Sequence, residues 1–555
     1  MVAAAGEEGA LAPAKAWALL VGTIALLGAI LALSRFTTMV GLHRLEKSPE
    51  VMNARAAEVV KKFGYAEPPA DRAGFYYQEG SYLQWRQRRF ASREQLRGLA
   101  ALEPSVVAYL YRQSPRPLVT IQSNGVVNVN DPPLTVPGMI NLVLDSRGQL
   151  QYFRALSPSY EETPAELAPA PFDWKLAFAE AGLDFSKFSP AQSKWNPMVP
   201  YDARMAWEGS IAAYPGEKFF VNAASYRGKL VWFHIAAPWT PVPGSATGGG
   251  SVIPVVMNIV LVTALMLGCA FFARRNIAAG RGDRKGAFRI MVFVSAVGLL
   301  DWLTGAHLTG SANELFNRFM DNLGDAVFLG VFLYVIYLAL EPFIRRRMPQ
   351  LLISWSRLLA GKFRDPLVAR DALLGLASGT LMVASIRVVQ ALPWWFDIKG
   401  MVPSPAQRSV LGDFSLAFSL LCTMVNRAFI NSLAMLGVFF LLSVVLRKKA
   451  LASLGLAITM TLLFAGESAN ISILAVTGAI YGGLMALVLL RLGQLAFLNA
   501  WFTLTLLNNF AAPLDLGRWY GSNVLLAVAS LAGLTLYCFY VSLGGKPIFG
   551  TALED

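Results

Sequence analysis

Apolar runs separated by short polar segments fill the second half of the chain from Val252 onward, and one more run lies near the N-terminus. A bilayer-spanning helix needs roughly 20 mostly apolar residues. The pattern therefore predicts a multi-pass α-helical membrane protein with about ten transmembrane helices. Residues 411–423 are also apolar, but they lead into polar side chains and are predicted to form an interfacial helix. The predicted spans are residues 16–34, 253–272, 288–304, 326–340, 372–392, 427–446, 450–465, 471–490, 495–510 and 524–542.

The first apolar run, residues 16–34, has the length of either a secretory signal or a retained anchor. The segment before it is acidic apart from Lys15, and no clear A-x-A cleavage site follows. We therefore predict a retained anchor helix. The remaining divisions are a cytoplasmic linker over residues 1–15, a polytopic helical domain over residues 252–542, and a cytoplasmic tail over residues 543–555.

Residues 41–250 form a long polar region in which one order of elements occurs twice. A helical segment stops at Gly64 in the first copy and at Gly182 in the second, and glycine is a common helix stop. Each copy then reaches the motif R-G-x-L-x-[aromatic]-F, at residues 147–153 and 227–233, which is typical of a hairpin turn and the following strand. We predict an inserted, two-lobed α+β domain with an internal duplication.

The composition also supports a membrane protein with one inserted polar domain. Hydrophobic residues make up 55% of the chain, charged residues only 15%, and the mean hydropathy is +0.47. So few charges could not cover several soluble domains. The three cysteines and three histidines are widely scattered, which excludes a disulfide framework and argues against a metal cluster. We expect no metal and no cofactor.

A net charge of +13 is typical of proteins that bind nucleic acid, but the positions of the basic residues along the chain indicate membrane topology instead. Residues 41–250 carry 22 Lys/Arg against 19 Asp/Glu, a net of +3. Alternate loops between the apolar runs carry 18 cations, against four on the other loops. Because positively charged loops stay in the cytoplasm, we expect both termini inside, residues 41–250 outside, and no nucleic-acid partner. The 18 cations are Arg274, Arg275, Arg281, Arg284, Lys285, Arg289, Arg345, Arg346, Arg347, Arg357, Lys362, Arg364, Arg370, Arg447, Lys448, Lys449, Arg491 and Lys546.

Motifs of soluble enzymes are absent from the sequence: it has no G-x-x-x-x-G-K-[ST], H-E-x-x-H, G-x-S-x-G, H-R-D or D-F-G, and we expect no enzyme. Polar side chains in or beside the spans are the candidate ligand-binding residues, because charge in hydrocarbon usually faces a partner or a cavity. Three interpretations stay open: snorkelling or ion pairs such as Asp301 with Arg387, an outward-opening ligand or ion pocket, and a proton relay. The candidates are Asp301, His307, Arg387, Asn426, Arg427 and Glu467.

One cytoplasmic loop contains large apolar residues at helical spacing among basic residues. This pattern predicts an amphipathic helix on the inner leaflet, with Arg357 and Lys362 near anionic headgroups. A helix that docks a partner protein is the alternative. The apolar residues are Leu351, Leu352, Trp355, Leu358 and Leu359.

The same loop carries a family resemblance. The stretches LEPFIRRR (340–347) and ISWSRLLAGKFRDPLVARD (353–371) resemble the membrane module of a group of bacterial transmembrane serine/threonine protein kinases, and the similarity extends over nearly the whole chain. In those proteins a cytoplasmic kinase domain precedes the first span, where this chain has only residues 1–14, so no phosphotransfer residue maps onto it. Further matching stretches are KSPE (47–50), YRQSPRPL (111–118), DPPL (131–134) and AWEG (206–209).

The resemblance implies a receptor-like input module in a bacterial inner membrane, and we expect extracytoplasmic sensing or signal input. The kinase would be supplied by a cytoplasmic partner or by an extension upstream of Met1. The expected partners are the lipid bilayer, this kinase or another protein, and an unknown extracytoplasmic ligand. The alternatives are a polytopic transporter and an intramembrane peptidase, for which Glu341 and His307 are present without a paired-Glu motif.

Overall fold

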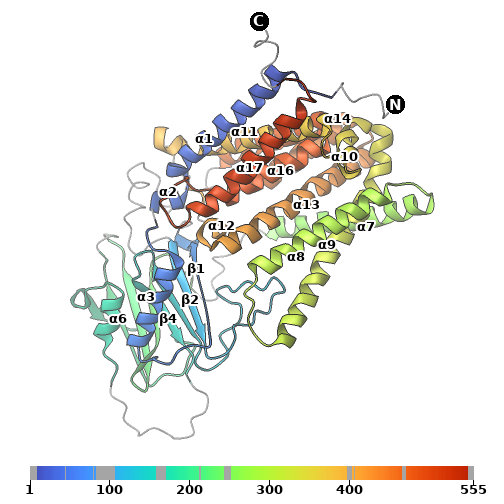
Figure 1. Ribbon diagram of the computed structural model, residues 1–555. Helices are drawn as coiled ribbons and strands as arrows, with labels where there is room; N and C mark the ends of the chain where they lie inside the picture. The colour runs from blue at the N-terminus through green and yellow to red at the C-terminus, as the bar shows by residue number, and fades with distance from the viewer. Residues whose placement is uncertain are drawn as a thin grey trace.

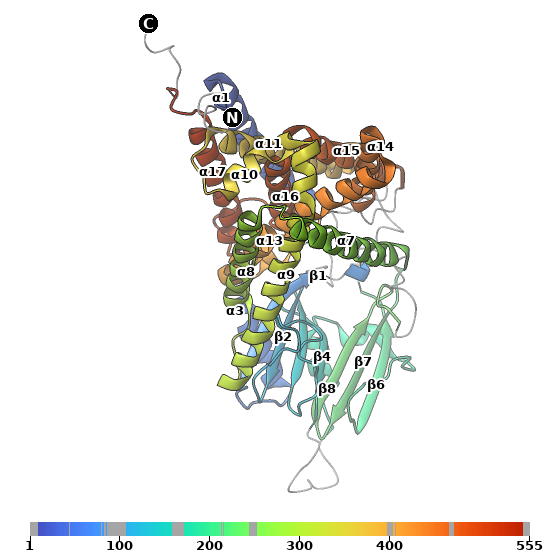
Figure 2. The ribbon, with the colours of Figure 1, turned by 90° about the vertical axis from the view of Figure 1, so that its right-hand side faces the viewer.

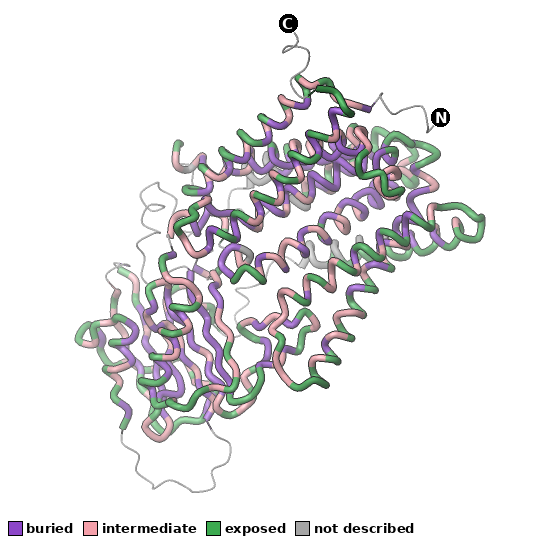
Figure 3. Tube along the Cα trace, viewed as in Figure 1, coloured by how far each residue is buried: buried purple, intermediate pink, exposed green. Residues whose placement is uncertain are grey.

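The computed structural model describes residues 9–43, 45–78, 80–82, 85, 107–157, 171–211, 214, 216–242, 252–396, 403–405, 407–464 and 471–547. The apolar helices pack into one bundle, and the polar region folds into a sheet domain at one end of it (Figure 1 and Figure 2). Buried residues follow the inner sides of the helices and the sheet (Figure 3).

Among the described residues, six helices of the bundle are long and apolar enough to cross a membrane. They are α1 (Pro13–Thr37), α8 (Arg284–Gly305), α9 (Ala312–Arg347), α11 (Pro366–Phe396), α13 (Phe414–Leu446) and α17 (Gly521–Ser542). The bundle also contains α7 (Val252–Ala278), α14 (Lys449–Phe464), α15 (Ile471–Leu487) and α16 (Gln494–Asn509). The 16 residues of α14 or α16 extend about 24 Å, which is less than the roughly 30 Å of a hydrocarbon core. Shorter helical segments are α2 (Met39–His43), η3 (Pro349–Leu351), α10 (Ile353–Leu359), α12 (Arg408–Leu411) and η4 (Val488–Leu492).

The prediction of a separate interfacial helix over residues 411–423 is wrong. α13 begins at Phe414 and continues unbroken to Leu446, so Asn426 and Arg427 lie inside it. The side chain of Asp413 accepts the backbone N–H of Leu416 at 2.8 Å and caps the helix start. The capping residue sets the boundary here, because it satisfies a backbone donor that a helix start leaves unpaired.

The described residues of the sheet domain form one continuous antiparallel sheet of eight strands in the order β1-β2-β3-β4-β8-β7-β6-β5. Helix α3 (Pro49–Lys62) precedes β1, and α6 (Trp174–Glu180) with the short η2 (Phe185–Lys187) precedes β5. Each half of the sheet is therefore a helix followed by a four-stranded meander. The strands are β1 (Asp71–Gln78), β2 (Val107–Ser114), β3 (Ile140–Asp145), β4 (Leu150–Ala155), β5 (Phe188–Pro190), β6 (Ala203–Gly209), β7 (Phe219–Tyr226) and β8 (Lys229–Ala236).

Corresponding features recur in the two halves. Gly64 ends α3 at φ +96° and Gly182 ends α6 at φ +66°, a left-handed region that glycine enters without a Cβ clash. At the centre of the sheet β4 pairs with β8, and Phe153 lies directly opposite Phe233. Each of these rings packs against an aromatic ring beside or within a helix, Phe153 against Phe63 and Phe233 against Phe178. The two lobes expected from the sequence are thus halves of a single sheet.

Several contacts seat the sheet domain on the bundle. The backbone N–H of Met39 donates to Ser404 O at 2.9 Å, and the N–H of Ser404 donates to Thr37 O at 2.7 Å. The indole of Trp519 stacks on Tyr76, with ring centroids 5.6 Å apart. The first two bonds join the end of α1 to the segment before α12, and the Trp519 stack joins the segment before α17 to β1, so the domain and the bundle share a packed boundary.

The opposite end of the bundle carries basic loops. There the start of α1 meets the end of α17 through a 2.9 Å hydrogen bond from Leu11 N–H to Ser542 O. The loop before α8 meets the end of α9, where Asp283 N–H donates to a carboxylate oxygen of Glu341 at 3.2 Å. We call this the basic end of the bundle.

The segment of the predicted amphipathic helix forms η3 and α10, and three of its five large apolar residues face protein. Leu351, Leu352 and Trp355 are buried, and the Trp355 ring lies near Tyr337 and Phe429. Three of the five apolar side chains therefore pack on neighbouring helices, while Leu358 and Leu359 are half-buried. Apolar spacing alone could not distinguish these two environments, because lipid and helix surfaces are similarly apolar.

Candidate functional site

A polar pocket of about 430 Å³ lies where the sheet domain meets the bundle. The loop between β2 and β3 forms one side of it, and α8, α9, α12 and α13 form the others. Its volume is in the range of small-molecule sites. The lining residues are Gln122, Asn124, Val126, Asn128, Asp301, Trp302, Gly305, Asn322, Arg408, Leu416, Ser419, Leu420 and Thr423.

Asp301, one of the candidates from the sequence, supplies the carboxylate of this pocket. Its two oxygens accept hydrogen bonds from Ser419 at 2.5 Å and Thr423 at 2.8 Å, both on α13. These bonds fix the carboxylate in one orientation, and hydrogen bonds to a charged acceptor are the stronger kind. A Cβ at Gly305 would collide with the Ser419 hydroxyl, so α8 and α13 approach closely here only because residue 305 is glycine.

Two further candidates lie along the same side of α13. Ser419, Thr423 and Asn426 are spaced by four and three residues, which places them along one face of a helix, and Arg427 follows Asn426 and is exposed. Asn426 is buried and lies near Gly298 of α8, and Arg427 is close enough to Asp301 to interact with its charge. The polar face of α13 therefore continues inward from the pocket.

Polar atoms of the pocket remain without a partner. Within the described part of the chain, the indole N–H of Trp302, the Nε of Arg408 and the side-chain oxygen of Asn322 are buried and unpaired. Trp302 as a whole is only 6% exposed. Buried donors and acceptors are nearly always satisfied in proteins. Two unpaired donors and one unpaired acceptor thus belong to residues that line this pocket.

Arg408 holds the sheet domain and the pocket together. Its guanidinium lies over the Phe75 ring, 4.2 Å from the centroid, and donates to Val127 O at 3.1 Å. Burial lowers the pKa of Arg408 from its ordinary value. An anion in the pocket would offset this loss of solvation, because an opposite charge favours the ionised guanidinium.

The loop of the sheet domain is held in place by buried charge. The Asp131 carboxylate accepts the N–H groups of Ile121 and Gln122 at 2.6 and 2.9 Å. Arg112 is buried beneath it and donates to Asn128 O at 2.7 Å and to the Asn141 side chain at 2.9 Å. Burial lowers the pKa of Arg112 to about 10. The loop thus presents its amide side chains from a fixed backbone.

His307, another candidate, does not line the pocket. It lies beside the pocket and joins the bundle to the sheet domain. Its Nε2 lies 3.0 and 3.1 Å from the Asp71 carboxylate oxygens, and its backbone N–H donates to Gly125 O at 2.8 Å. Burial alone would raise the pKa of Asp71, but the Leu118 N–H and His307 outweigh burial and lower it. We call Asp71, Gly125 and His307 the joint.

Arg387 and Asp301 do not form the ion pair suggested by the sequence. Arg387 is fully buried at a different position, where it donates to Gln390 and Ser404 at 2.7 Å each and to Asn508 at 3.2 Å. Through Ser404 it supports the end of α1. Glu467 lies outside the described residues.

Sequence reasoning found Asp301 but missed most residues around it. Two signals were present: hydroxyls four residues apart in an apolar helix, Ser419 and Thr423, and the amide-rich run from Gln122 to Asn130. Neither signal points to the other in sequence, because nearly 300 residues separate them. Searches against family models, curated proteins and solved structures found no match to the chain.

Proposed function

We propose that this chain is a signal-input membrane protein that senses a small polar ligand in the pocket between its sheet domain and its helical bundle. One observation carries the proposal: the pocket is built jointly by a loop of the domain and by bundle helices, and it contains buried polar atoms without partners. A ligand that touches both parts changes the free energy of their relative arrangement. Such differential binding is the physical requirement of a sensor.

The chemistry of the lining favours a small zwitterion such as a free amino acid. The Trp302 and Arg408 N–H groups are unpaired donors, among described residues, and suit a carboxylate. Asp301 keeps lone pairs beyond its two hydroxyl bonds, and the Asn322 oxygen is an acceptor, so both suit an ammonium group. One ligand with both charges would satisfy all four groups.

The position of the pocket favours sensing over transport. A transporter binds its substrate near the bilayer midplane, at helices that are interrupted there. Here α8 and α13 pass the site as continuous helices, and the site lies at the end of the bundle next to the sheet domain. Accumulation of a ligand inside sealed proteoliposomes would contradict this proposal.

The test is ligand-dependent stabilisation of the purified full-length chain, with the standard amino acids as probes. A ligand that binds only the folded protein raises its melting temperature. Asp301→Asn should weaken the responding probe about 10- to 100-fold, because hydrogen bonds to a charged group contribute roughly 1.5–3 kcal/mol. Asp321→Asn, at an exposed carboxylate of α9, is the matched control. A response that is equal in both variants, or no response to any probe, would refute the proposed ligand class.

For topology we propose ten spans in a bacterial inner membrane, with the basic end in the cytoplasm and the sheet domain outside. The positive loops and the meeting of α1 with α17 at the basic end support this orientation. Activity reporters fused at Gly125, Gly282 and Gly361 test it. A cytoplasmic signal at Gly125 would reverse the orientation.

We also propose that the sheet domain arose by duplication of a helix and four strands. Support comes from the repeated element order and from the pairing of β4 with β8 around Phe153 and Phe233. Superposition of the two halves in an experimental structure tests this directly. Failure of β3–β4 to superpose on β7–β8 would leave the repeated motif as a coincidence.

The signal would pass to a serine/threonine kinase domain, as the resemblance implies, and this chain would not itself transfer phosphate. The mechanism needs a lysine, an aspartate base and metal-binding residues in one folded site. An assay of the purified chain with labelled ATP and a divalent metal tests whether this chain transfers phosphate. Saturable nucleotide binding or autophosphorylation would contradict it.

A further inference from the structure

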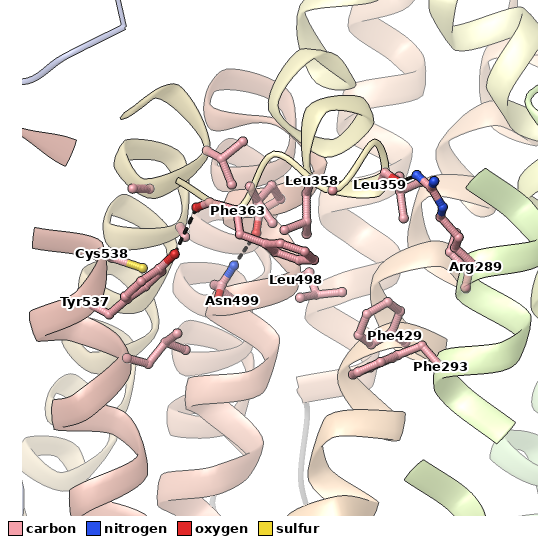
Figure 4. Close-up of a pocket in the computed structure, with 17 residues that line it drawn as sticks. Arg289, Phe293, Leu358, Leu359, Phe363, Phe429, Leu498, Asn499, Tyr537 and Cys538 are labelled. Carbon is pink, nitrogen blue, oxygen red and sulfur yellow. Dashed lines mark hydrogen bonds between the residues drawn. The ribbon is translucent and has the colours of Figure 1, made fainter. Parts of the chain in front are cut away.

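A second cavity, of about 730 Å³, lies towards the basic end of the bundle. Side chains from α8, α11, α13, α16 and α17 form its walls, and the segment from α10 to Phe363 covers one side (Figure 4). It shares no lining residue with the polar pocket at the joint. Twelve of its 17 lining residues are leucine, isoleucine, valine, alanine or phenylalanine.

The polar side chains of these walls are turned to backbone oxygens. Asn499 donates to Leu495 O at 2.9 Å, and Tyr537 donates to Phe363 O at 3.1 Å (Figure 4). Arg289 donates to Leu359 O at the edge of the cavity. The interior therefore offers hydrocarbon contact and few hydrogen bonds, and it suits an apolar chain better than a polar molecule.

The edge of the cavity is cationic. Lys362 and Arg364 alternate with Gly361 and Phe363, which line the cavity, and both cations are exposed. Arg289 is exposed on the α8 side. Among the described residues, none of these three cations forms an ion pair with a carboxylate. The nearby Asp365 is already neutralised by Arg357 at 2.9 Å.

We propose that this cavity binds one acyl chain of an anionic phospholipid, with the phosphate held by Arg289, Lys362 and Arg364. The apolar walls take the chain, and the exposed cations at the edge take the headgroup, as basic pockets between membrane helices do for anionic lipids. Charge complementarity selects an anionic lipid over a zwitterionic one. The inference is independent of the proposed sensing function.

Native mass spectrometry of the purified full-length chain can test this, with dioleoyl phosphatidylglycerol and dioleoyl phosphatidylcholine as probes. The unchanged chain should bind phosphatidylglycerol at least tenfold more tightly. Ala372→Phe fills the cavity from α11 and should weaken both lipids at least tenfold. Val368→Phe fills it from a second position, in case the first variant does not fold. Ala529→Phe, on the exposed side of α17, is the matched control and should bind as the unchanged chain does.

The headgroup site is tested separately on exposed residues. The double variant Lys362→Gln and Arg364→Gln leaves Arg289 in place and should lower the preference for phosphatidylglycerol severalfold, while phosphatidylcholine binds as before. Arg274→Gln with Arg275→Gln removes two exposed cations of α7 as a control and should keep the preference. Equal loss in both double variants, or full lipid binding by the cavity-filling variants, would show only non-specific lipid around the helices and would overturn the proposal.

Discussion

Replacement of Gly125 by alanine tests whether the sheet domain closes on the bundle through the joint. Gly125 has φ +69°, and a Cβ built on it would lie 2.6 Å from Ala306 Cβ, 3.3 Å from Ala306 Cα and 3.4 Å from the Trp302 indole nitrogen. Two of the crowding atoms belong to the short segment after α8. Alanine therefore meets both an unfavourable backbone conformation and a wall that cannot rotate away.

The expected magnitude follows from these two terms. A non-glycine residue in the left-handed region costs about 1–2 kcal/mol. Relief of the clash requires the loop to move, which breaks the 2.8 Å hydrogen bond from His307 N–H to Gly125 O, worth about 1 kcal/mol. The closed arrangement should lose about 2–3 kcal/mol, which corresponds to a roughly 30- to 150-fold shift towards an open joint.

Hydrogen exchange of the full-length chain can measure this shift, because the His307 amide is protected only while the joint is closed. The control is Gly216→Ala. Gly216 also has a positive φ, +85°, but no described atom lies within 4 Å of its Cβ position. Gly216→Ala therefore carries the backbone strain without the clash. The peptide containing His307 should exchange much faster in Gly125→Ala and at the unchanged rate in Gly216→Ala.

Equal exchange at His307 in Gly125→Ala and in the unchanged chain would refute the close approach of loop and bundle. Faster exchange throughout the sheet domain would instead indicate that the substitution unfolds the domain. In that case the faster exchange would report unfolding of the domain and not opening of the joint. Peptides from β7 and β8 distinguish the two outcomes, because they lie far from the substituted loop in the sheet order.

Three further predictions concern the sheet domain and the joint. Phe153→Ala and Phe233→Ala should each lower the free energy of unfolding by about 3–5 kcal/mol, because both rings are fully buried, and pulse proteolysis of the full chain can measure it. Burial lowers the pKa of His234 to about 4 from 6.5, so the unfolded domain binds the extra proton first and stability should fall by up to roughly 3 kcal/mol as the pH drops from 6.5 to 4. His234→Gln should flatten this pH dependence, and an unchanged slope would contradict the assignment. The pKa of Asp71 is lowered in the folded protein, so its charge stabilises the fold at every pH above 3.8, the ordinary pKa of the group. This stabilisation is lost as the pH falls further. Asp71→Asn should therefore speed exchange of the His307 amide at neutral pH. Unchanged exchange would show that contacts other than the Asp71–His307 pair keep the joint closed.

Local features of this protein could be predicted from the sequence because they depend on neighbouring residues. Apolar run length indicated helices that can cross a membrane, and in the described part of the chain six helices have the required length and apolarity. Gly64 and Gly182 indicated helix ends, because few other residues adopt a positive φ there. The start of α13 was mispredicted, since the capping side chain of Asp413 decided it rather than hydropathy.

The tertiary structure alone decided which faces of the helices meet. In a membrane protein the lipid-facing and protein-facing sides are both apolar, so hydropathy does not show that Trp355 packs on other helices or that Arg387 bonds to Ser404 and not to Asp301. The pocket joins an amide-rich loop to hydroxyls on α13, and the joint joins Asp71 to His307, 236 residues later in the chain. Such contacts arise from packing of distant elements, and no local pattern of residues encodes them.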